Sequence, residues 1–98
     1  MLATFFEWTI HPGREDEFVS TWGEGTKLLL KEGSLGSALF RAGNGRFSAL
    51  ARWPNAVTRD AAFECLRDHK TIARMHECVA ETHRCDDAEE ISNMWRVA

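Results

Sequence analysis

The sequence has 98 residues, the length of one domain with one hydrophobic core, and we expect a single domain over 1–98. Its 44% hydrophobic and 28% charged residues exclude a disordered chain, and no apolar run approaches the ~18 residues of a membrane span. The net charge of −3 gives no electrostatic footprint for nucleic acid, and the odd count of three cysteines predicts reduced thiols in a cytoplasmic protein.

The first third of the chain predicts a strand followed by a helix. Apolar and polar residues alternate over 3–11, which is the pattern of a half-buried strand. Pro12 and Gly13 end this strand, and the acidic residues 15–17 stand where the dipole of a following helix favours anions. The spacing of apolar residues extends that helix to about Lys31.

The clearest local signal is a β-hairpin. Two strand-like runs, 35–42 and 46–53, are separated by Gly43-Asn44-Gly45, and Asn-Gly is the preferred pair for a tight hairpin turn. The second run alternates between an apolar and a more polar face. We therefore expect two adjacent antiparallel strands here.

The second half of the chain predicts a helix and a last strand. Apolar spacing indicates a helix over 57–84, with a candidate break near His69 and Lys70. The acidic run 86–90 is expected to be polar and solvated, and alternation over 91–97 predicts the last strand. The element order is then β-α-β-β-α-β.

This order predicts an α+β fold of the ferredoxin-like type, in which one antiparallel four-stranded sheet carries both helices on one face. Some strands also carry apolar residues toward the other face. An uncovered apolar face is a partner site, so we expect a homodimer that packs two sheets face to face through the open sheet face.

Three stretches of the sequence resemble antibiotic biosynthesis monooxygenase (ABM) domains. These are 11–18 followed by Trp22, 33–41, and 47–54 with its strand-ending Trp53. The resemblance covers nearly the whole chain and implies a dimeric α/β barrel with a pocket between sheet and helices. It also implies oxygenation of polycyclic phenols to quinones without metal or flavin, so no cofactor is expected.

The sequence departs from the family pattern in two ways. Members that act on polycyclic phenols often place Tyr in the pocket, and this chain has none. Haem-degrading relatives carry a His about ten residues after the strand-end Trp, where this chain has Phe63, and the nearest His is His69. These departures keep a second hypothesis open, a non-catalytic dimeric module that binds haem or another hydrophobic small molecule.

Aromatic residues are the candidates for binding an aromatic small molecule. Trp53 ends a strand at the edge of the expected pocket, where it could stack on a flat ligand or could simply pack in the core or its rim. We also assign Trp22 and Phe63 to the substrate-binding wall; Trp22 fits the apolar face of its helix, which favours core packing as its alternative role.

The catalytic candidates are histidines and an arginine. His69, His76 and His83 are seven residues apart and would form a stripe along one helix face. We predict that His69 or His76 acts as the base that removes a phenolic proton, the alternative being that they are exposed or at the core edge. Arg52 could hold an anionic oxygen of the substrate, as could Arg41; the alternative is an exposed strand residue or a dimer-interface ion pair.

A metal site is not expected. Cys65 and His69 have the i, i+4 spacing that could supply two ligands from a helix, but no second Cys/His pair lies at a suitable spacing. The resemblance to ABM domains, together with these polar candidates, favours a cofactor-independent monooxygenase that oxidises an electron-rich aromatic, with the binding module as the alternative.

Overall fold

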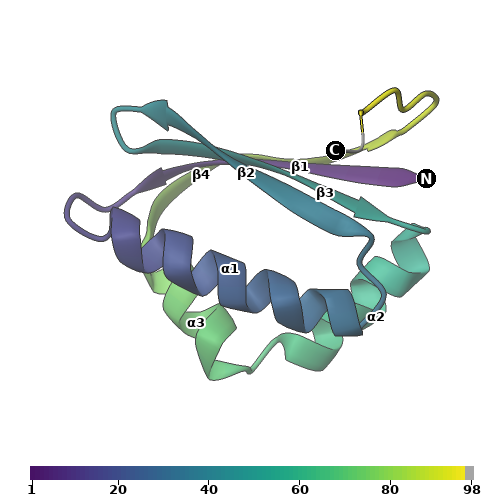
Figure 1. Ribbon diagram of the computed structural model, residues 1–98. Helices are drawn as coiled ribbons and strands as arrows, with labels where there is room; N and C mark the ends of the chain where they lie inside the picture. Colours follow the sequence, from purple (N-terminus) through teal and green to yellow (C-terminus); the bar gives the residue numbers. More distant parts are fainter. Residues whose placement is uncertain (97–98) are drawn as a thin grey trace.

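A computed structural model describes residues 1–96 as one sheet covered on one side by helices (Figure 1). The sheet is antiparallel with strand order β2-β3-β1-β4, which is the ferredoxin-like arrangement and confirms the predicted fold class. The elements in chain order are β1 (Leu2–Ile10), α1 (Glu15–Lys31), β2 (Gly36–Gly43), β3 (Arg46–Trp53), α2 (Ala56–Leu66), α3 (Lys70–Glu77) and β4 (Val79–Glu89).

The local signals of the first half are confirmed. Helix α1 begins with three acidic residues in its first turn and ends at Lys31, close to the predicted boundaries. Asn44 and Gly45 connect β2 to β3 with φ values of 53° and 72°, the left-handed conformations that a tight hairpin turn needs.

Two apolar clusters hold the helices on the sheet. In the larger one, Phe18 of α1 makes edge-to-face contacts with Trp8 and Phe47, each at a ring-centroid distance of 5.3 Å. In the smaller one, Trp53 and Ala51 of β3 pack against Ala62 of α2. The clusters lie toward opposite ends of the helical layer, so space between them is left for a pocket.

The helical region predicted over 57–84 is interrupted near His69 and Lys70, as expected, but it ends earlier than predicted. Residues 67–69 separate α2 from α3, and His69 caps α3 by accepting a hydrogen bond on Nδ1 from the backbone N–H of Thr71 at 3.1 Å. Helix α3 ends at Glu77. The prediction of helix beyond that residue is wrong, because 79–89 pair with β1 as the edge strand β4.

The last strand was predicted over 91–97, but in the structure it lies earlier in the chain, as β4. The acidic run 86–90 lies mostly within β4, and the residues from 91 to 96 form no regular element. Val97, which the prediction also included, lies outside the described residues. In the described part of the chain, no helix has the length and apolar character needed to cross a membrane.

The sheet face opposite the helices, called the open face below, carries a mixture of apolar and charged side chains. Phe5 and Leu50 are cross-strand partners near its centre, and Phe40 on β2 is 49% exposed. The Arg84 guanidinium lies 4.4 Å from the centroid of the Phe5 ring. No other element of residues 1–96 covers this face in Figure 1.

Candidate active site

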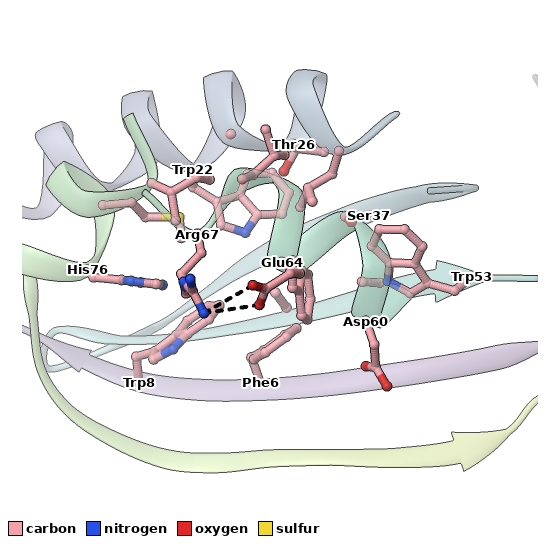
Figure 2. A pocket seen from close by; sticks show the side chains of 18 residues that line it. Phe6, Trp8, Trp22, Thr26, Ser37, Trp53, Asp60, Glu64, Arg67 and His76 are labelled. Carbon is pink, nitrogen blue, oxygen red and sulfur yellow. Dashed lines mark hydrogen bonds and ion pairs between the residues drawn. The ribbon is translucent and has the colours of Figure 1, made fainter. Parts of the chain in front are cut away.

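A pocket of about 490 Å³ lies between the sheet and the helical layer, and Figure 2 shows the side chains that line it. Strands β1, β2 and β3 and all three helices contribute to its wall. Its volume falls within the range of small-molecule sites, and its wall is predominantly apolar, as such sites usually are.

The pocket exists because small residues stand where sheet and helix face each other. Ala49 and Ala51 of β3 and Gly25 of α1 line it. A Cβ atom added at Gly25 would come within 3.0 Å of Ile72 Cδ1, so even one methyl group would crowd the contact between α1 and α3. Side chains no larger than methyl leave the central space between the two apolar clusters unfilled.

Aromatic rings form much of the wall. Phe6 and Trp8 stack on each other from β1, with centroids 5.2 Å apart and ring planes at 11°, and Trp22 reaches into the pocket from α1. Trp53 and Phe63 close the other end with an edge-to-face contact at 5.7 Å. Trp22, Trp53 and Phe63, which the sequence assigned to substrate binding, all line this pocket, and their binding role stays a prediction.

Trp53 holds a hydrogen-bond donor that has no partner. Its side chain is fully buried, and Nε1 is without an acceptor within the described residues. An unsatisfied buried donor costs about 1–3 kcal/mol, so such a group at the wall of a pocket is one that a ligand acceptor would stabilise. Phe63 packs on Trp53 but is itself 39% exposed, so its ring has room to turn aside for a ligand.

Polar side chains lie at the rim, where the pocket meets solvent. His76 of α3, Asp60 and Glu64 of α2, and Arg67 directly after α2 all line it (Figure 2). Arg67 and Glu64 form an ion pair at 3.1 Å, and both side chains are about two-thirds exposed, so the pair contributes little to stability. A ligand can therefore displace either partner at small cost.

Sequence reasoning missed Asp60, Glu64 and Arg67. Asp60, Phe63, Glu64 and Arg67 follow the i, i+3, i+4, i+7 spacing of one helix face. Because Phe63 was already a candidate wall residue, this spacing could have assigned its polar neighbours to the same pocket.

The structure does not bring the three spaced histidines together. Only His76 lines the pocket; His69 caps α3 and is not part of the wall. His83 lies on β4 rather than on a helix, so the predicted helical stripe is wrong. At a local irregularity of the strand pairing, the His83 Nε2 and Thr9 Oγ1 atoms are hydrogen-bonded at 2.7 Å.

Arg52 lies away from the pocket. It alternates along β3 with the pocket-lining residues Ala51 and Trp53, so its side chain is on the open face. There it donates two hydrogen bonds to the carboxylate of Glu90, at 2.8 and 2.7 Å, and these bonds hold the pKa of Glu90 below its usual value. Arg41 faces the helix side but lies over Phe47, 5.1 Å from its ring centroid.

No metal centre is formed by residues 1–96, since no three His, Cys, Asp or Glu side chains in that range come together in a suitable arrangement. Cys65 and His69 thus remain without further ligands. The three cysteines are free, and only Cys78 is buried.

The fold and pocket define the class of protein: a ferredoxin-like plait that holds a ligand-sized, aromatic-lined cavity between sheet and helices. No family model matches the sequence, and no curated protein is similar to it in sequence. Solved structures do share the fold over almost the whole chain.

One such structure, from Chloroflexus aurantiacus, bears the name antibiotic biosynthesis monooxygenase and superimposes with a TM-score of 0.83 at 12% identity, covering 96% of both chains. A protein of the same name from Bordetella bronchiseptica has a TM-score of 0.77 at 20% identity, covering 93% of this chain and 97% of its own. A mutant of SnoaB, a cofactor-independent oxygenase from Streptomyces nogalater, has a TM-score of 0.79 at 12% identity and 95% coverage of both chains. This chain therefore has the ABM-type fold.

Proposed function

We propose that this protein is a cofactor-independent monooxygenase of the ABM type that oxidises an electron-rich aromatic small molecule. The observation that carries the proposal is the pocket itself, whose size and aromatic wall suit a flat ligand and whose inner end holds the unpartnered Trp53 Nε1–H. The shared fold with SnoaB supports the same reading by analogy.

Each part of the pocket has a role in this proposal. Trp22 and Phe63 hold the ring system by stacking and apolar contact, and the Trp53 indole N–H donates to a carbonyl or phenolate oxygen. His76 is the base, because it is the one imidazole among the pocket-lining residues. Arg52 and His69 are left out, because neither lines the pocket.

The chemistry needs only the substrate and dioxygen. His76 takes a proton from an acidic C–H or phenolic O–H, and the resulting anion transfers electrons to dioxygen. A CH₂ group then becomes a carbonyl group, one oxygen atom is retained, and the other leaves as water with the two hydrogens. A donor at Trp53 Nε1 stabilises the developing negative charge on the substrate oxygen, and the apolar wall limits access of water.

The proposal includes a homodimer through the open face. Phe5, Leu50 and Phe40 place apolar area there, and large exposed apolar surface marks an interaction site. A two-fold axis would bring the same face of both subunits together.

Oxygen uptake by purified, metal-stripped protein with anthrone tests the proposal. We expect protein-dependent uptake that survives a chelator, with one anthraquinone formed per dioxygen consumed. His76→Ala should lower kcat by about 10²-fold or more, as loss of a general base does. His11→Ala is the matched control, since His11 is an exposed imidazole in the loop between β1 and α1 and does not line the pocket.

A second candidate function is a non-catalytic module that binds a hydrophobic small molecule or haem. The exposed position of His76 at the rim favours it, because a catalytic base is usually held more firmly. Tight binding of anthrone without oxygen uptake would support this module and overturn the enzyme. Uptake that is unchanged in His76→Ala would overturn the assignment of the base alone.

A further inference from the structure

A second cavity of about 370 Å³ lies beside the candidate active site, between α3 and strand β4. It shares three wall residues with the pocket, namely Phe6, Trp8 and His76. The stacked rings of Phe6 and Trp8 are therefore a common floor for both, and His76 of α3 lies at the border between them. A ligand held in the pocket can extend past His76 into the second cavity.

Strand β4 continues the floor of the pocket toward the edge of the sheet. Cys85 pairs with Phe6 and Thr82 pairs with Trp8, and directly opposed residues of two antiparallel strands point to the same face of the sheet. The Cys85 and Thr82 side chains are therefore on the pocket side, where they line the second cavity. Both residues are exposed, so this part of the floor is open to a ligand.

The wall that β4 contributes is almost free of charge. Val79, Thr82 and Cys85 are uncharged, and Glu81 is the single charged residue of β4 at this cavity. No Lys or Arg is among the described residues that line it. An anionic substituent would meet the Glu81 carboxylate without a compensating cation, which is unfavourable. The second cavity therefore suits a neutral group, such as an alkyl or hydroxyalkyl chain.

The roles proposed for Trp53 and His76 determine which part of a substrate faces the second cavity. Figure 2 shows these two side chains at opposite ends of the pocket. In anthrone, the carbonyl group and the reactive CH₂ group are on opposite sides of the central ring. With the carbonyl at Trp53 and the CH₂ group at His76, a substituent beside the CH₂ group, at ring position 4, points past His76. A substituent beside the carbonyl, at ring position 1, points to the end that Trp53 closes.

We infer that the second cavity binds a neutral alkyl or hydroxyalkyl substituent that the aromatic substrate carries beside its reacting carbon. The inference rests on the proposed function, because the roles of Trp53 and His76 set the orientation of the substrate. It adds a part of the substrate that the pocket alone does not hold. Thr82 and Cys85 are then specificity-determining residues, since they contact the substituent and not the reacting atoms.

Anaerobic calorimetric titration of the full chain with anthrone, 4-butylanthrone and 1-butylanthrone tests the inference. The two butyl isomers have the same composition, so they differ only in where the butyl group points. Each buried CH₂ group raises the affinity about fourfold, so a half-buried butyl group should lower the Kd roughly tenfold or more. We therefore expect 4-butylanthrone to bind roughly tenfold more tightly than anthrone, and 1-butylanthrone to bind no more tightly than anthrone.

A pair of variants tests where the butyl group lies. Cys85→Phe fills the second cavity, so 4-butylanthrone should then bind no more tightly than anthrone. Aromatic residues are favoured in strands, and a thermal melt checks that this variant keeps the fold. Glu89→Phe is the matched control, because it adds the same ring at an exposed position of β4 that lines neither cavity. It should keep the wild-type preference for 4-butylanthrone.

The possible results separate this inference from the proposed function. Equal Kd values for the two isomers, or a preference for 4-butylanthrone that persists in Cys85→Phe, would overturn the subsite and leave the oxygenase in place. The expected isomer preference in a protein that consumes no oxygen with anthrone would support the subsite and overturn the oxygenase. A protein that binds none of the three compounds would overturn both.

Discussion

The unpartnered indole N–H of Trp53 leads to a prediction about ligand choice. Trp53→Phe removes the donor and keeps an aromatic ring at the end of the pocket. In the ligand-free protein, the substitution changes the stability of the fold in two opposing ways. The smaller ring loses roughly 1–2 kcal/mol of apolar contact, a fraction of the 3–5 kcal/mol that full truncation costs, while removal of an unsatisfied donor returns about 1–3 kcal/mol. The melting temperature should therefore change little.

The effect should appear when a ligand binds. Anthrone has a carbonyl acceptor, and 9,10-dihydroanthracene has the same ring skeleton with CH₂ in its place. A neutral hydrogen bond contributes about 1 kcal/mol net, so the variant should bind anthrone about fivefold more weakly and dihydroanthracene with nearly unchanged affinity. Anaerobic calorimetric titration measures both without consuming the ligand. Equal weakening for the two ligands would refute the donor role and leave Trp53 as a wall residue.

Three further variants test how the fold is held. Gly23→Ala should stabilise α1 by about 0.5–1 kcal/mol, because nothing lies within 4 Å of the added methyl. Gly33→Ala should destabilise the folded protein by about 2 kcal/mol or more, because φ is +108° and the added methyl would lie 2.7 Å from Thr58. The melting temperature should therefore rise for Gly23→Ala and fall for Gly33→Ala. A hydrogen bond from Arg59 holds the pKa of Asp87 below its usual value, so Asp87 stabilises the fold above the usual carboxylate pKa and ceases to do so as the pH falls through its lowered value. The free energy of unfolding of Asp87→Asn should therefore depend less on pH between about 5 and 2 than that of the wild type. Parallel plots of this free energy against pH for the two proteins would contradict the prediction.

The sequence predicted the fold where local chemistry decides structure. The acidic first turn of α1 and the Asn44-Gly45 turn are set by the dihedral angles and charges of a few adjacent residues. Strand β4 was missed because it carries no such signal. It is exposed along almost its whole length, so it lacks the alternation by which a half-buried strand is recognised. Apolar spacing extended the predicted helix to residue 84, whereas α3 ends at Glu77, between His76 and His83.

The aromatic lining of the pocket was predicted from the sequence, and of the polar candidates only His76 lines it. Trp53 follows from its place at the end of β3, and Trp22 from its place on α1. Arg52 was misplaced because a strand alternates between two faces, and the residue beside a pocket-lining Trp53 must point the other way. Arg52 contacts Glu90 because β1 pairs with both β3 and β4 and so sets their relative register. This long-range register cannot be read from any local sequence pattern.

The exposed edge strand β4 also limits how copies of this protein can assemble. It carries Glu81, Asp86, Asp87 and Glu89 against the single cation Arg84, and its pairing with β1 is interrupted by two irregularities. Two such edges brought together would oppose acid to acid along their length. Acidic charge and broken register are features that protect natural sheets from continuous edge-to-edge growth. Edge-to-edge pairing of two copies through β4 is therefore disfavoured.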